Sequence, residues 1–279
     1  MRQLHDERAR TRWDNAAPGW NRQRALLQDW LAEPTEAMLD RASIGPGMRV
    51  LDLAAGTGDQ AFAIARRIGA GSMLLTDISP VMLRMSAQNL SAAGVRNAKF
   101  ECLDMEASAL QEASFDAAAC RLGLMFAVNP ERVLRSVRVA LRPQGRFSVL
   151  VFSAPSGNPT MCIILSIAQR HAGKPPRDPF DPGSLMSLGK PGLLEVLFKA
   201  EGFHDVHVAP IATSIHAISA QAYLEFVQSA AAPVCELLNG LTAAGRVTAL
   251  AEMAGALSPF MRGNMFEAPV ELLLASGRV

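Results

Sequence analysis

The sequence predicts an α/β protein with a doubly wound, mostly parallel sheet of seven strands, helices before it and a lid inserted after the fifth strand. From residue 48 onward, short apolar runs alternate with amphipathic stretches, and this alternation is typical of a parallel sheet with helices on both faces. The first run, VLDLAAGTGDQ (50–60), ends in an acid followed by Gly56 and Gly58. A strand, a glycine turn and a helix in this order form nucleotide-type cofactor sites in open α/β sheets.

The elements of the core follow one another closely. Residues 1–45 are expected to form a separate N-terminal helical cap, because tryptophans and leucines are scattered among charged residues there. Pro80 and Gly94 mark the start and the end of one helix. Residues 46–153 form the predicted cofactor-binding core, with strands at 48–54, 72–77, 98–104, 115–120 and 145–153 and helices at 61–68, 80–94 and 129–141.

The alternation stops near residue 154. An apolar helical stretch and then a proline-rich loop, GKPPRDPFDPGS, follow it. An insertion after the fifth strand leaves from the carboxyl ends of the strands, where ligands bind in such sheets, so residues 154–190 are interpreted as a lid or substrate cap. Residues 191–279 are expected to complete the core with a helix at 191–203, a strand at 204–217, a long helical stretch at 220–257 and a buried strand at 268–278.

The composition excludes several classes of protein. The 279 residues carry a net charge of +1 with both signs interspersed, which gives no electrostatic footprint for nucleic acid. No apolar run approaches the ~18 residues of a membrane-spanning helix, and the charged N-terminus lacks a signal-peptide core. The four cysteines form no CxxC pair, which indicates free thiols and no metal site. We expect a soluble, cytoplasmic protein that binds a small molecule and has no integral membrane association. Whether it forms a homodimer stays open.

Three acidic residues close three successive predicted strands: Asp52, Asp77 and Asp104. Asp77 lies about 20 residues after the glycine turn, where a carboxylate can accept both hydroxyl protons of a ribose. Asp104 can accept a hydrogen bond from an adenine amine while Met105 packs on the ring. A single acid at a strand end is more often a turn or cap residue, but three beside a glycine turn favour a cofactor site.

A nicotinamide dinucleotide is the alternative cofactor, because residues 56–61 also fit the pattern G-x-G-x-x-A. Asp52 and Asp59 beside the turn would repel its pyrophosphate and would attract an amino group. The single tyrosine, Tyr223, has no lysine four residues further on, so a reductase pair is missing. S-adenosylmethionine (SAM), with an adenosine end and a cationic amino-acid end, fits better, and an NAD-dependent reductase is disfavoured.

Five segments resemble the ordered motifs of class I SAM-dependent methyltransferases: VLDLAAGTGD, LTDISPVML, CLDMEAS, FDAAACRLGLMF and LRPQGRF. The resemblance is closest to the branch with the ubiquinone and menaquinone C-methyltransferases and their small-molecule relatives. It covers residues 45–153 and implies a Rossmann-like fold. Three features differ from the quinone enzymes and argue against a quinone itself: RLGLMFAV stands in place of an arginine–asparagine signature, Gln144 stands in place of a glycine, and the proline-rich loop is not theirs.

The resemblance also implies roles for individual residues. Those assigned to the cofactor are Gly56 and Gly58 on the methionine part, Asp77 on the ribose, Ile78, Asp104 and Met105 around the adenine, Arg121 and Leu122 on the floor near the methionine part, and Trp20 closing over the cofactor; Asp52 and Thr57 complete the predicted site. Met125 and Phe126, after the fourth strand, are predicted to line either the substrate pocket or the core.

Methyl transfer from a sulfonium has a neutral leaving group, so alignment carries most of the rate. A general base is needed only when the acceptor arrives protonated. By position, His171 in the lid and His216 at the end of the sixth strand are the candidates for a base, and no catalytic role is assigned to either. The expected function is methylation of an O or C atom of a small, partly apolar metabolite, such as a quinone-like, phenolic or polyketide-like compound. The alternative is a non-catalytic SAM-binding module.

Overall fold

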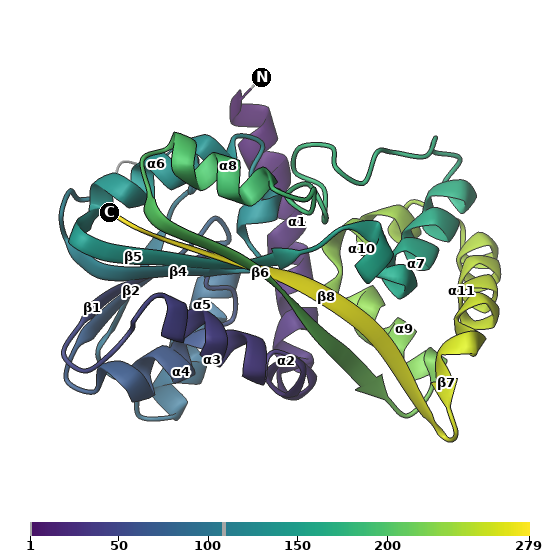
Figure 1. The fold of residues 1–279 in the computed structure, drawn as a ribbon. Coiled ribbons are helices and arrows are strands. Elements are labelled where there is room, and N and C mark those ends of the chain that lie inside the picture. The colour runs from purple at the N-terminus through teal and green to yellow at the C-terminus, as the bar shows by residue number, and fades with distance from the viewer. Residues whose placement is uncertain (1, 108–109) are drawn as a thin grey trace.

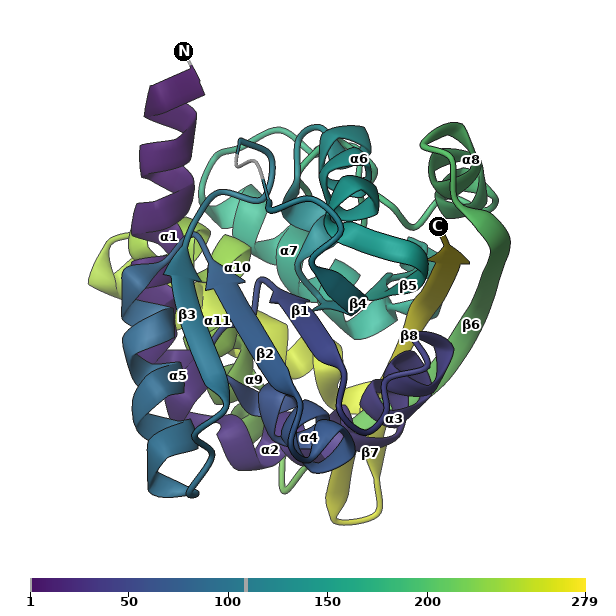
Figure 2. The ribbon, with the colours of Figure 1, turned by 90° about the vertical axis from the view of Figure 1, so that its left-hand side faces the viewer.

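A single twisted sheet forms the centre of the computed structural model, which describes residues 2–107 and 110–279, with side chains from residue 7. The strand order is β3-β2-β1-β4-β5-β8-β6, and β7 pairs with β8 (Figures 1 and 2). Strands β1 to β5 pair in parallel, and β8 runs antiparallel between β5 and β6. The strands are β1 (Arg49–Leu53), β2 (Ser72–Asp77), β3 (Ala98–Cys102), β4 (Phe115–Arg121), β5 (Leu141–Phe152), β6 (His204–Ala217), β7 (Met261–Arg262) and β8 (Met265–Arg278).

The predicted doubly wound, mostly parallel sheet is confirmed, and the two-residue strand β7 is an addition. Helices cover both faces, with α6 and α8 above the sheet and α3 and α4 below it in Figure 1. The helices are α1 (Arg2–Arg22), α2 (Arg24–Trp30), α3 (Ala32–Arg41), α4 (Asp59–Ile68), α5 (Pro80–Ala92), α6 (Pro130–Ala140), α7 (Pro159–His171), α8 (Leu193–Ala200), α9 (Ala220–Ala230), α10 (Ala232–Asn239) and α11 (Ala243–Leu257), with 3₁₀ turns η1 (Leu124–Phe126), η2 (Pro155–Gly157) and η3 (Ser258–Phe260).

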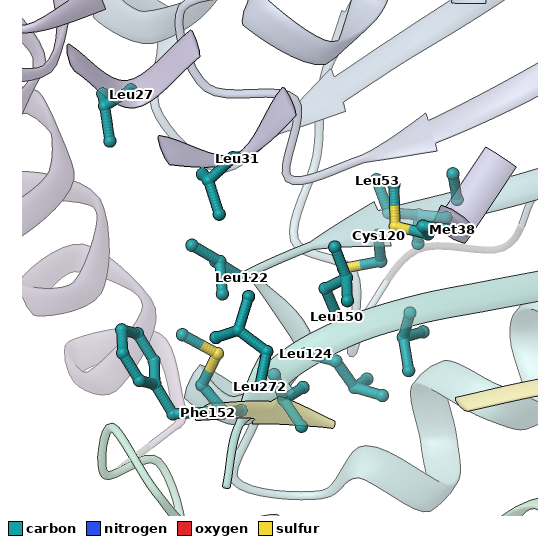
Figure 3. Packing of buried hydrophobic residues seen from close by; sticks show 14 of the residues in the cluster. Leu27, Leu31, Met38, Leu53, Cys120, Leu122, Leu124, Leu150, Phe152 and Leu272 are labelled. Atoms are coloured by element: carbon teal, nitrogen blue, oxygen red, sulfur yellow. The ribbon is translucent and has the colours of Figure 1, made fainter. Parts of the chain in front are cut away.

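The hydrophobic core covers both faces of the sheet, and one part of it lies between the sheet and the N-terminal helices. Leu31, from the junction of α2 and α3, lies near Leu122 at the end of β4, and Leu150 of β5 lies close to Cys120 (Figure 3). The side chain of Cys120 is fully buried, and burial raises the pKa of its thiol to about 12. This thiol is therefore an apolar packing group, as expected from its place in a strand.

Helices α7, α9, α10 and α11 pack together as a helical lobe beside the sheet (Figure 1). The predicted helical stretch at 220–257 is confirmed but divided into three helices, because Pro233 cannot continue α9 and Gly240 follows the last residue of α10. The 14-residue strands β6 and β8 extend as an antiparallel pair toward this lobe. None of the helices in the described part of the chain has the length and hydrophobicity to span a bilayer.

Helix α1 connects the two parts of the molecule, because it packs against α5 of the sheet domain and against α9 and α10 of the lobe. At Gly19 of α1 the two backbones lie close together, because an added Cβ atom would overlap the carbonyl oxygen of Ser229 in α9 and would lie 2.5 Å from its carbonyl carbon. One turn of α1 also carries Trp20, whose Nε1 donates to the carbonyl oxygen of Ala230 at 2.7 Å. The backbone contact therefore fixes α1 above the carboxyl ends of the strands.

Candidate functional site

A cavity opens at the carboxyl ends of β1, β2 and β4, under α1, and encloses about 1040 Å³ including its open mouth. It lies where β2 and β4 leave β1 in opposite directions, which is the place where open α/β sheets bind ligands. The lining comes from four strand ends, η1, α4, α5 and α1: Ala9, Trp13, Trp20, Ala54, Ala55, Gly56, Thr57, Asp59, Gln60, Thr76, Asp77, Ile78, Met82, Leu103, Asp104, Met105, Glu106, Arg121, Leu122, Gly123 and Phe126.

Gly56 and Gly58 are each required in the turn for a different structural reason. Both have positive φ, +56° at Gly56 and +86° at Gly58. A Cβ on Gly56 would meet no described atom within 4 Å, whereas one on Gly58 would overlap the hydroxyl of Ser86 in α5. Gly56 therefore leaves room for a ligand at the cavity wall, and Gly58 allows α5 to pack closely.

Asp77, at the end of β2, is held rigidly at the wall. Its Oδ2 accepts from the backbone N–H of Gly56 and its Oδ1 from that of Ser79, both at 2.9 Å. Burial raises its pKa to about 6, and the nearby carboxylate of Asp14 adds to this while the backbone hydrogen bonds oppose it. Each oxygen keeps a further lone pair, so the carboxylate can accept two hydroxyl groups of a ligand.

The negative charge of Asp59 is neutralised by side chains of the protein itself. Its Oδ1 accepts from Nε of Arg24 at 2.8 Å and from Nε2 of Gln28 at 3.3 Å. Its Oδ2 accepts from the hydroxyl of Thr57 at 2.8 Å. Contrary to the expectation from the sequence, this acid does not offer an unpaired charge to an amino group.

Asp52 and Gln60 form a buried pair beside the turn. Nε2 of Gln60 donates to Oδ1 of Asp52, and burial raises the pKa of Asp52 to about 7 although this hydrogen bond opposes the shift. Gln60 borders the cavity, whereas Asp52 lies behind it. The sequence did not predict Gln60 as a site residue. Its available signal was an amide in the first turn of a helix that follows an acid-ended strand.

The end of β4 forms the floor of the cavity. Nη1 of Arg121 donates to the hydroxyl of Thr35 in α3 at 2.9 Å, and burial lowers the pKa of this guanidinium while Asp59 and Asp52 oppose the shift. Leu122 has a positive φ of +57°, as does Ala54 with +51°. Strained non-glycine backbone of this kind concentrates at functional sites, and here both residues border the cavity.

The roof consists of aromatic side chains from α1. Trp20 borders the cavity as predicted. Trp13, which the sequence did not predict as a site residue, also borders the cavity. Its ring makes an edge-to-face contact with Phe126, with a centroid distance of 4.9 Å and an interplanar angle of 71°. The roof therefore combines one predicted and one unpredicted tryptophan.

The structure gathers nine of the eleven predicted cofactor residues around one cavity, together with Phe126; Asp52, Gly58 and Met125 lie behind its wall. The two histidines lie elsewhere. Nε2 of His171 contacts Oε2 of Glu252 in α11 at 2.8 Å, and His216 is exposed on β6. Among residues 2–107 and 110–279, no group of three or more His, Cys, Asp or Glu side chains converges on a metal site.

The predicted lid does not border the cavity, although its last part packs behind the wall that η1 forms. Its helix α7 packs against α10 and α11, and Ser187 donates from its hydroxyl to the carbonyl oxygen of Met125 at 2.6 Å. No residue of 154–190 borders the cavity in the described chain. A role of this segment as a substrate cap stays a prediction.

Comparison with known proteins agrees with this geometry. Residues 44–168 match a protein family described as a methyltransferase domain. The ubiquinone/menaquinone biosynthesis C-methyltransferase UbiE of Bordetella avium is 39% identical over 116 residues, which are 41% of this chain and 45% of that protein. These matches support the resemblance to class I SAM-dependent methyltransferases that the sequence predicts. The UbiE protein of Idiomarina loihiensis is 34% identical over 42% of this chain and 47% of its own length.

The chain as a whole also has structural neighbours. Phosphoethanolamine N-methyltransferase 2 of Haemonchus contortus, solved with phosphomonomethylethanolamine and S-adenosylhomocysteine, has a TM-score of 0.59 at 14% identity over 92% of this chain and 57% of that chain. The [4+2]-cyclase SpnF has a TM-score of 0.55 at 17% identity over 95% and 96% of the two chains. These neighbours confirm the fold alone, and the chain spans about half the length of the curated relatives it matches.

Proposed function

We propose that this chain binds SAM in the cavity under α1 and transfers its methyl group to an O or C atom of a small, partly apolar metabolite. The observation that carries the proposal is the juxtaposition of Gly56, Asp77 and the tryptophan roof around one cavity. The free space beside Gly56 and the fixed carboxylate of Asp77 fit an adenosyl cofactor, because the two hydroxyl groups of its ribose need hydrogen-bond acceptors.

The cavity wall suggests how the cofactor would be held. Asp77 would accept from the ribose hydroxyls, and Ile78, Asp104 and Met105 would surround the adenine. The methionine part would then lie along the glycine turn toward Arg121, whose guanidinium suits a carboxylate. SAM supplies an electrophilic methyl group, and the residues of the chain align the acceptor and exclude water.

The acceptor side of the proposal rests on the chemistry of the lining. Trp13, Leu122 and Phe126 present apolar surface, and no histidine or lysine borders the cavity among the residues that the structure describes. An acceptor that ionises readily, such as a phenol, a quinol or the carbon between two carbonyl groups, needs little help from a base. Quinone-like, phenolic and polyketide-like metabolites meet this requirement, and the activity named for the UbiE relatives supports this range.

A non-catalytic SAM-binding module is the second candidate, favoured by the absence of histidine and lysine from the described lining. An NAD-dependent reductase is disfavoured, because Tyr223 has no lysine four residues further on and because the buried acid Asp52 lies beside the glycine turn. A dinucleotide pyrophosphate would be repelled there.

Calorimetry separates these functions. We expect micromolar binding of SAM and S-adenosylhomocysteine (SAH) and no binding of NADH. Transfer of a labelled methyl group from SAM to a panel of phenols, quinols and 1,3-diketones then tests catalysis. Failure of both adenosyl ligands to bind at millimolar concentration would refute the proposal, and binding without transfer to any acceptor class would favour the non-catalytic module.

A further inference from the structure

Helix α1 is fastened to the wall of the cavity by side chains that do not belong to its described lining. Oδ1 of Asp14, in the middle of α1, accepts from the hydroxyl of Ser79 at 2.5 Å. Two turns further along, Oδ1 of Asn21 accepts from Nδ2 of Asn89 in α5 at 2.9 Å. The same Nδ2 donates to the carbonyl oxygen of Thr57 in the glycine turn at 3.0 Å. Residues seven positions apart lie on one face of a helix, so this face of α1 contacts the wall at two points.

The contact of Asp14 reaches the loop that fixes the proposed ribose acceptor. Only Ile78 separates Ser79 from Asp77 in the chain. The backbone N–H of Ser79 donates to Oδ1 of Asp77 at 2.9 Å, while its hydroxyl donates to Asp14 and accepts from the N–H of Met82 as the N-cap of α5. Ser79 is fully buried, so solvent does not compete for these bonds. One residue therefore joins the carboxylate on α1 to the carboxylate at the end of β2.

We infer that Asp14 is a positioning residue for the cofactor, because it ties α1 to the ribose acceptor Asp77 through Ser79. The inference rests on the proposed binding of SAM. Trp13, the residue before Asp14, borders the cavity, so a displacement of α1 at this point moves the roof relative to Asp77. The N-terminus of α5 favours a carboxylate here, since its N–H groups and dipole attract negative charge, and the N–H of Val81 lies 3.5 Å from Oδ1 of Asp14.

Asp14 also influences the charge of Asp77. Burial raises the pKa of Asp77 to about 6, and the carboxylate of Asp14 adds to this rise. From β1, Asp52 repels the same carboxylate. The other charged residues of the described lining are Asp59, Asp104, Glu106 and Arg121. A carboxylate accepts hydroxyl groups more strongly than a neutral acid, so the affinity for an adenosyl ligand should fall as the pH drops through about 6. Without the charge of Asp14, this fall should occur at lower pH.

Two substitutions separate the hydrogen bond of Asp14 from its charge. Asp14→Ala removes both, and the calorimetric affinity for SAH should fall by about three- to tenfold, because a hydrogen bond to a charged acceptor is lost. The affinity for 5′-methylthioadenosine, which has the ribose but lacks the amino-acid end, should fall by the same factor. Asp14→Asn keeps an oxygen that can accept from Ser79, so it should retain both affinities at pH 8 within about twofold. Thermal unfolding of each variant verifies that it is folded.

The pH profile gives a readout that a merely structural contact would not move. In titrations between pH 5 and pH 8, the midpoint of the decrease in SAH affinity should lie about half a pH unit lower in Asp14→Asn than in the wild type. Glu7→Gln removes an exposed charge from the same helix and should change neither affinity nor midpoint. Asn21→Ala loosens α1 at an uncharged contact, so it should weaken SAH binding and leave the midpoint in place.

The possible outcomes separate the inference from the function beneath it. An unchanged midpoint in Asp14→Asn, or wild-type affinity in Asp14→Ala, would overturn the inference. Equal losses of affinity in Asp14→Asn and Asp14→Ala at pH 8 would do the same. If Asp14→Ala does not fold, the midpoint in Asp14→Asn decides alone. Failure of the wild type to bind SAH and 5′-methylthioadenosine would instead refute the proposed function.

Discussion

The crossing of α1 and α9 gives the sharpest prediction about the architecture of the cavity. In Gly19→Ala, the new Cβ would lie 2.5 Å from the carbonyl carbon of Ser229. The carbonyl oxygen of Ser229 would lie nearer still to the new Cβ, and non-bonded carbon contacts prefer about 3.5 Å, so the two helices must separate by roughly 1.5 Å or more. This separation lengthens the hydrogen bond from Trp20 to Ala230, which is now 2.7 Å, and displaces the roof of the cavity.

The expected cost follows from two opposing effects. Overpacking of this kind costs about 1–3 kcal/mol, whereas alanine in place of glycine inside a helix gains up to about 1 kcal/mol. The overlap with a backbone carbonyl cannot be relieved by a rotamer change, so the cost should prevail. A net loss of about 1–2 kcal/mol corresponds to a decrease in Tm of roughly 2–6 °C for a domain of this size.

Differential scanning calorimetry and SAH titration measure the two consequences. The control is Gly255→Ala in α11, where the added Cβ meets nothing within 4 Å among the described atoms and where Tm should stay constant or rise. We expect Gly19→Ala to lower Tm and to weaken SAH binding, because the roof tryptophans move with α1. A Tm that rises as in the control, with unchanged SAH affinity, would refute the close crossing and the roof together.

Three further predictions concern the cavity wall and the buried Asp52 behind it. Asp77→Ala should weaken SAH binding at least tenfold, about 1.4 kcal/mol, by removing the ribose acceptor, as calorimetry can measure. Trp13→Ala should weaken it about two- to tenfold through loss of aromatic contact, and SAH should quench less of the tryptophan fluorescence in this variant. Burial raises the pKa of Asp52 from 3.8 to about 7, so the folded state binds this proton more tightly than the unfolded state. Its contribution to stability therefore falls as pH rises through that range, and Asp52→Asn should flatten the Tm profile between pH 4 and pH 7.

The sequence was informative where function depends on neighbouring residues of one chain segment. The strand, glycine turn and helix around Gly56 are local, and so is the acid that ends β2. Because the strands are parallel, their carboxyl ends converge without further information, which is why Asp77, Asp104 and Leu122 meet as predicted.

The remaining parts of the site depend on how distant segments pack. Trp13 matters because α1 crosses at Gly19, and no local pattern encodes that crossing. Gln60 matters because its amide folds back onto Asp52. The apolar helix α7 can pack on any apolar surface, and it lies against α10 and α11 rather than over the cavity. His171 illustrates the same point, since its partner Glu252 is 81 positions away.

The long antiparallel pair of β6 and β8 has a consequence for how such a protein can change. Ala217 at the end of β6 and Phe266 near the start of β8 are direct partners in the sheet. The chain therefore leaves the β6–β8 pair and rejoins it at adjacent positions. Residues 218–264, which include α9, α10 and α11, therefore form an insertion whose two ends lie side by side in the sheet. A segment of this kind can be lengthened, shortened or exchanged as one piece while the register of the sheet stays the same.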